Sequence, residues 1–193
     1  MKIVHYPHPA LRHPSRPLTA IDGSVRKQAA QMLELMYEAR GIGLAANQVA
    51  WPYQLLVFNE TADPEQREHE FVCINPVILE RKGSLEGEEG CLSFPMLYQK
   101  VRRAKTVKVQ YYNLEGQAVV MEASDLVARV VQHEVDHLQG VLFIDRMGFL
   151  AKRACRNSLA EFERQYRLAQ KKGEIPSDEE IAKILASAEV PAL

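Results

Sequence analysis

Residues 130–138 read Val-Val-Gln-His-Glu-Val-Asp-His-Leu and contain a His-Glu-x-x-His motif. Residues four apart lie on the same face of an α-helix, so His133 and His137 can bind one metal ion together. Glu134 lies beside them and is placed to accept a proton from a metal-bound water. The motif therefore predicts a helix that carries a metal site.

Apolar residues flank the motif at helical spacing and predict which side of this helix faces the core. One stripe consists of Leu126, Val130 and the two histidines, and the adjacent stripe of Val127, Val131, Glu134 and Leu138. The polar residues of the same segment are expected on the opposite side: Arg129, Gln132 and Asp136. The pattern predicts that both histidines and the glutamate point inward.

A glutamate that points inward needs a partner, because an unpaired buried carboxylate is costly. A bound metal ion with its water would provide one for Glu134. The same residues also fit a helix with two core histidines and a glutamate paired for structural reasons, because the short motif occurs by chance in unrelated chains. The choice between these interpretations depends on the rest of the chain.

A catalytic site of this kind has three protein ligands, so a third is required. In the extended motif a third histidine follows a glycine; here Gly140 is present, but Phe143 occupies the histidine position. A carboxylate on the next helix, such as Glu161 or Glu163, is a second candidate, although that helix is strongly charged. Cys91 is the third candidate, because a thiolate is a strong ligand for zinc or iron(II).

Length and composition predict one domain with enough residues to bury a core: 193 residues with a formal net charge of −1. A net charge near zero produces no positive electrostatic field that would attract a polyanion, so a nucleic-acid substrate is not expected. We also expect no membrane segment, because no run of 18 apolar residues occurs and prolines interrupt the N-terminus. Three widely spaced cysteines argue against disulfides and, with these features, for a cytoplasmic protein.

The order of the expected elements is typical of an α+β fold, because strands precede helices without a regular βαβ rhythm. We expect mixed or antiparallel strands packed around the central metal-binding helix, and a C-terminal helical extension. Helices are predicted at residues 24–40, 125–139 and 149–172 and after Ser177, and strands at 54–59, 71–79, 106–112 and 117–121. Pro76 should lie at an edge or a bulge, Gly41 should end the first helix, and residues 83–90 read as an acidic turn.

Two domain parts are expected: a catalytic part, 1–147, and an extension, 148–193. The apolar positions Leu150, Ala154, Leu159 and Phe162 should pack the long helix on the core, whereas the segment after Gly173 reads as short and separable.

Residues 41–48, Gly-Ile-Gly-Leu-Ala-Ala-Asn-Gln, carry little side-chain bulk. Such a run suits a backbone that another group approaches closely, or tight packing of a helix against a strand. Together with residues 89–93, Glu-Gly-Cys-Leu-Ser, and 132–137, it resembles the three signature motifs of the peptide deformylase family, in the family's order and spacing. The Cys-Leu-Ser-Phe-Pro version and the long C-terminal helix resemble the type I branch of bacteria and organelles.

The resemblance implies hydrolysis of the N-formyl group from N-formylmethionine of nascent polypeptides, with release of formate. It implies one divalent ion, Fe²⁺ most often, with Zn²⁺, Ni²⁺ or Co²⁺ as substitutes. The implied ligands are Cys91, His133 and His137, and the implied catalytic groups are Glu134, the amide of Gln48 and the backbone N–H of Leu92. A zincin-like metallopeptidase that uses Glu161 and a non-catalytic metal-binding relative are the alternatives.

The resemblance also implies where the peptide binds. Its backbone would lie along Ile42 and Gly43, with Gly90 opposite, and Leu126 and Val130 would line the methionine pocket. The ribosome is a candidate place of contact with nascent chains, and the oligomeric state is open. Two departures from the family pattern, Asn47 and residues 96–98 (Met-Leu-Tyr), are expected on the substrate rim.

Overall fold

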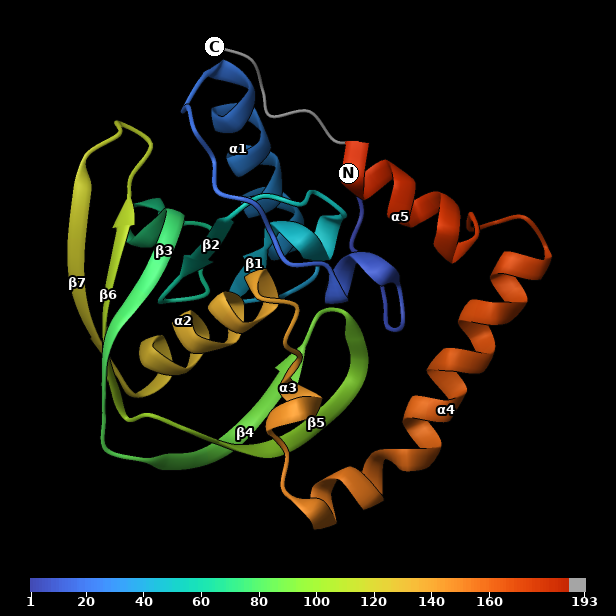
Figure 1. The fold of residues 1–193 in the computed structure, drawn as a ribbon. Helices are drawn as coiled ribbons and strands as arrows, with labels where there is room; N and C mark the ends of the chain where they lie inside the picture. Colours follow the sequence, from blue (N-terminus) through green and yellow to red (C-terminus); the bar gives the residue numbers. More distant parts are fainter. Residues whose placement is uncertain (188–193) are drawn as a thin grey trace.

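The computed structural model describes residues 1–187, which form two antiparallel sheets with a central helix between them (Figure 1). The helices are α1 (Gly23–Glu38), α2 (Asp125–Leu138), α3 (Phe143–Arg146), α4 (Phe149–Lys171) and α5 (Asp178–Ser187), with short 3-10 helices η1 (Pro9–Arg12), η2 (Ala46–Val49) and η3 (Arg67–His69). The strands are β1 (Gly43–Ala45), β2 (Leu55–Asn59), β3 (Glu70–Lys82), β4 (Leu85–Cys91), β5 (Phe94–Arg103), β6 (Thr106–Tyr112) and β7 (Ala118–Ser124). The predicted α+β class is confirmed. None of the described helices is long and apolar enough to cross a bilayer.

The larger sheet has the strand order β1-β2-β3-β6-β7, and β4 and β5 form a separate two-stranded sheet. The predicted hairpin is present as β6 and β7. Pro76 lies at a bulge of the central strand β3, where the register shifts between Ile74 and Val77, so the missing N–H breaks no regular ladder. Both β1 and β4 are edge strands, which leaves one side of each free to pair with a further segment.

The prediction of a turn at residues 83–90 was wrong, because β4 begins at Leu85 and continues to Cys91. Period-2 alternation marks a strand only when apolar residues occupy the inward positions. In β4 the inward positions next to α2 hold Gly87 and Glu89, whose neighbours on α2 are charged. The strand therefore carries no apolar alternation and cannot be recognised locally.

Helix α2 is buried on all sides from Ala128 to Leu138. One side packs on the larger sheet in a cluster that includes Leu56, Phe58, Val109, Val131 and Val135. The expectation that the polar residues lie on a side away from the core was wrong, because Arg129, Gln132 and Asp136 are also buried. The smaller sheet and the chain after it cover them: Gln132, for example, bonds the backbone N–H and carbonyl of Ala104.

Helix α1 ends at Glu38, two residues earlier than predicted. Arg40, with φ of 57°, adopts the left-handed conformation expected for Gly41. The N–H groups of Gly41 and Arg40 donate to the carbonyls of Met36 and Tyr37, at 2.8 and 2.9 Å. This pair of bonds is the Schellman arrangement, with Arg40 in the place that glycine usually takes.

The C-terminal helices pack on the N-terminal segment, and Figure 1 shows α5 turning back towards it. The buried face of α4 contains Cys155 and Tyr166, whereas Leu150 is 78% exposed and Ala154 is exposed, so these two predicted contacts were wrong. Leu159 and Phe162 do pack against the core. In α5, Ile181 and Leu185 belong to a buried cluster with Leu11 and Phe143. This packing contradicts the prediction that the segment after Gly173 is separable.

This packing predicts that α5 contributes to the stability of the whole chain. Ile181 is 4% exposed and Ile184, on the same helix, is 59% exposed. We expect Ile181→Ala to lower the free energy of unfolding by about 2–4 kcal/mol, because it leaves a cavity. Ile184→Ala, the matched control, should stay within about 0.5 kcal/mol. Denaturant unfolding measures both values, and equal effects would show that α5 does not pack on the core.

Candidate metal centre

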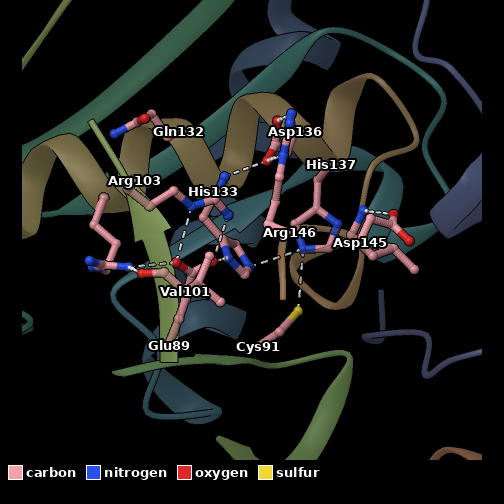
Figure 2. Close-up of polar contacts among 12 residues, drawn as sticks. Glu89, Cys91, Val101, Arg103, Gln132, His133, Asp136, His137, Asp145 and Arg146 are labelled. Atoms are coloured by element: carbon pink, nitrogen blue, oxygen red, sulfur yellow. Dashed lines mark hydrogen bonds and ion pairs between the residues drawn. The ribbon is translucent and has the colours of Figure 1, made fainter. Parts of the chain in front are cut away.

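Cys91, His133 and His137 lie close together (Figure 2). Cys91 is the last residue of β4, and the two histidines come from successive turns of α2. The Nε2 atom of His137 is 3.2 Å from Cys91 Sγ and 3.2 Å from His133 Nε2. All three ligand atoms lie within 4.8 Å of one another. Of the candidate third ligands, the fold brings Cys91 to the histidines.

The spacing of these atoms fits a shared metal ion. Ligands at about 2.1 Å for nitrogen and 2.3 Å for sulfur around a tetrahedral ion lie roughly 3.3–3.6 Å apart. The two separations of 3.2 Å are close to this range. Two imidazoles and a thiolate are also donors that zinc and iron(II) accept. The residues present therefore fit a divalent ion with a free position for water.

Glu89 orients one of the two imidazoles. Its Oε1 accepts a hydrogen bond from Nδ1 of His133 at 2.6 Å, which leaves Nε2 to face Cys91 and His137. A carboxylate behind a ligating histidine fixes the tautomer of the ring and raises the basicity of the ligand. Glu89 and Cys91 are two apart in β4 and so face the same side, but the turn predicted for residues 83–90 concealed this relation.

A buried network of charges holds Glu89 (Figure 2). Its carboxylate accepts from Arg103 Nη2 at 2.6 Å and from Arg129 Nη1 at 3.0 Å. Arg103 also pairs with Asp136, which in turn accepts from Arg146 Nη2 at 2.7 Å. Burial by itself would raise the pKa of Glu89, but hydrogen bonds from His133 and Arg103 outweigh it and hold the pKa well below its usual range. The carboxylate therefore stays charged.

Glu134 lies in the same buried region and lacks a complete set of partners. It is 4% exposed, and its Oε2 has no hydrogen-bond partner within residues 1–187. Burial raises the pKa of Glu134 to about 7. Such an atom is expected where a water or an ion completes the site. A carboxyl group with this environment suits proton transfer near neutral pH.

The carboxylate of Glu134 lies directly against the backbone of Gly43. A Cβ at Gly43 would lie 2.6 Å from Glu134 Oε1 and 2.9 Å from Val130 Cγ1, closer than atoms can approach. Edge strand β1 can therefore run directly over Val130 and Glu134 only because residue 43 has no side chain. Of the two predicted pocket residues, Val130 is buried here, whereas Leu126 in the first turn of α2 is 54% exposed.

Gln48 points its amide at the cluster. Its Oε1 accepts from the N–H of Ala45 at 2.8 Å, which turns Nε2 towards Cys91 Sγ at 3.5 Å and Ser93 Oγ at 3.2 Å. The preceding residue, Asn47, is buried and donates from Nδ2 to the carbonyl of His137. The expectation that Asn47 lies on the substrate rim was therefore wrong: it ties η2 to the end of α2.

Glu161, the alternative third ligand, is not part of the cluster. It is exposed on α4 and bonds Arg164 at 2.7 Å and Gln165 at 2.7 Å. Cys73 and Cys155 are free and buried, in agreement with the predicted absence of disulfides among the described residues. A zincin-like peptidase would need Glu161 as the third ligand, and Glu161 does not lie at this site.

The position of Glu89 predicts an effect on metal affinity. Glu89→Gln should weaken metal binding by about 10- to 100-fold, because the ring of His133 loses its charged partner. Glu88→Gln, at the exposed neighbour in β4, is the matched control. Competition with a chelator, measured on the folded fraction of each variant, gives the affinities. Unchanged affinity in Glu89→Gln would show that the carboxylate does not act on the ligand.

Comparison with known proteins agrees with this geometry. The polypeptide deformylase family model matches residues 1–153. A peptide deformylase from Rhodopirellula baltica is 43% identical over 182 residues, 94% of this chain and 90% of the relative. One from Nitrosococcus oceani is 43% identical over 164 residues, 85% of this chain and 96% of the relative.

Solved structures agree as well. Arabidopsis thaliana peptide deformylase 1B superposes with a TM-score of 0.85 at 38% identity, covering 92% of this chain and 96% of that one. The Plasmodium falciparum enzyme gives 0.84 at 39% identity, covering 86% and 98%. With identity and coverage this high, the chain belongs to the peptide deformylase family.

Proposed function

We propose that this metal-dependent deformylase holds iron(II) between Cys91, His133 and His137 and removes the formyl group from N-formylmethionine at the start of nascent polypeptides. The observation that carries the proposal is the convergence of three ligand atoms beside a buried carboxylate with an unpaired oxygen. Zinc, nickel or cobalt could occupy the same donors. When bound, such an ion polarises a water molecule and the formyl carbonyl.

The side chains around the cluster take the remaining roles. Glu134 accepts the proton of the attacking water and then delivers it to the leaving amine. The amide of Gln48, already turned inward by its bond to Ala45, donates to the oxygen that gains negative charge. The backbone N–H of Leu92, directly after Cys91, is assigned as the second donor. Fixed donors need no reorganisation when the charge develops, which is why they accelerate the reaction.

The substrate backbone would lie between two edge strands, β1 and β4. Its polar groups can pair with Ile42 and Gly43 on one side and with Gly90 on the other, as an extended peptide does when it adds to a sheet edge. The methionine side chain would then point at α2, where buried Val130 and half-exposed Leu126 line its pocket. An unbranched apolar side chain suits such walls.

The test of this function is the choice of substrate. We expect metal-loaded protein to release formate from formyl-Met peptides, with little reaction on acetyl-Met peptides, because an added methyl group must fit between the ion, Gln48 and Leu92. It should leave unformylated casein intact, because an endopeptidase needs room on both sides of an internal amide. Formate is measured enzymatically and peptide bonds by mass spectrometry. Cleavage of casein without formate release would favour a peptidase.

The cellular setting is part of the same proposal. N-formylmethionine occurs at the start of new chains, so the enzyme would act in the cytoplasm on nascent polypeptides, with the ribosome as the place of contact. Residues 1–147 would form the catalytic unit, and residues 148–193 a helical extension of it.

A further inference from the structure

Tyr98 covers the outer face of the smaller sheet next to the metal ligand Cys91. It pairs directly with Gly90 across β4 and β5, so both residues face the same side of this sheet. A Cβ at Gly90 would lie 2.6 Å from Cε1 and 2.7 Å from Cδ1 of Tyr98, so one edge of the ring lies directly against the glycine. Tyr98 as a whole is nevertheless 56% exposed.

This outer face is opposite to the one that carries the metal centre. Glu89, one residue before Gly90, points at α2 and bonds His133 and Arg129. Successive side chains of a strand point to opposite faces, so Gly90 and Tyr98 face away from α2. The Tyr98 ring thus stands over the edge strand at Gly90 but outside the methionine pocket.

The same alternation applies to an extended substrate at this edge. If the methionine side chain points at Val130 of α2, the side chain of the next residue must point to the other face. That face is where the ring of Tyr98 lies. We propose that Tyr98 is a specificity-determining residue that contacts the second side chain of the formylated peptide and favours apolar and aromatic residues there. This inference rests on the proposed function.

The surroundings of the ring support an apolar partner. Met96, two residues before Tyr98 in β5, is 88% exposed, so a second large apolar side chain reaches the surface close to Tyr98 in the sequence. The next cross-strand pair beyond Gly90 and Tyr98 on this face is Glu88 and Lys100, which carry opposite charges and attract neither sign selectively. Aromatic rings gain most from contact with other rings and with flat or aliphatic groups. The peptide class with the best fit therefore has phenylalanine or leucine after the formylmethionine.

The experiment compares formyl-Met-Xaa-Ser peptides, in which Xaa is Phe, Leu, Ala or Asp. For the wild type we expect kcat/KM to be about threefold to tenfold higher with Phe than with Ala, mainly through KM. Tyr98→Ala should reduce this ratio to within about twofold, mainly by raising KM for the Phe peptide. Tyr98→Phe should keep the ratio, because the ring remains.

Tyr112→Ala is the matched control, because Tyr112 is an exposed tyrosine of β6 in the other sheet. It should keep the wild-type ratio. An unchanged ratio in Tyr98→Ala, an equal loss in Tyr112→Ala, or a wild type without preference would each overturn the inference while leaving the deformylase function in place. Absence of formate release from every peptide by the metal-loaded wild type would overturn both.

Discussion

Replacing Cys91 with alanine should leave the protein without tightly bound metal and reduce formate release to background. In the proposed site the thiolate is one of three protein ligands, and two imidazoles alone would hold a divalent ion weakly. The geometry adds a second reason: Cys91 Sγ is 3.2 Å from His137 Nε2, so its loss opens the site on one side. Metal content per chain, measured after anaerobic purification and gel filtration, tests the expectation.

The other two cysteines provide the controls for this experiment. Cys73→Ala and Cys155→Ala remove thiols that are free and buried outside the cluster, so both variants should keep about one metal ion per chain. Thermal unfolding establishes that each variant is folded. If Cys91→Ala binds metal with the affinity of the wild type, the assignment of the Cys-His-His ligand set is wrong.

The second large effect is expected for Glu134→Gln. The amide keeps the shape of the side chain but cannot accept the proton of the attacking water, so kcat should fall by about 100- to 10,000-fold. The metal should remain, because Glu134 is not one of the three clustered ligands. Single-turnover measurement of formate release on metal-loaded protein separates the chemical step from product release.

Glu161→Gln serves as the control for Glu134→Gln. Glu161 is exposed and paired with Arg164, so its replacement should change neither metal content nor kcat. Wild-type turnover in Glu134→Gln would remove this carboxylate from the mechanism. Loss of metal in Glu161→Gln would instead revive the peptidase-type ligand set.

Some of these features could be read from the sequence because their signals are local. The helix that carries His133 and His137 follows from a period of 3.6 residues, and the hairpin of β6 and β7 follows from alternation around a turn signal. The bulge at Pro76 follows from a missing N–H. The choice of Cys91 as third ligand came from a resemblance between motifs, and the fold places its sulfur beside the histidines.

Other features were hidden because they depend on which segments meet. The polar side of α2 resembles a solvent-exposed face in the sequence. It is buried because the smaller sheet and the segment after it pack over it. Strand β4 lacks apolar alternation because its inward position 89 holds a carboxylate that pairs with Arg103 and Arg129. The docking of α5 through Ile181 depends on a contact with the opposite end of the chain.

The sequence by itself determined the central helix with its two histidines and the α+β class, because periodicity and motif spacing are properties of neighbouring residues. The tertiary structure alone decided which carboxylate orients His133, where Asn47 lies, and that Tyr98 covers Gly90. Each of these depends on a pairing across strands or between a loop and a helix. A buried charge is costly unless an opposite charge lies next to it, and in this site the partners come from other segments of the chain. Only the fold decides which of these segments are neighbours.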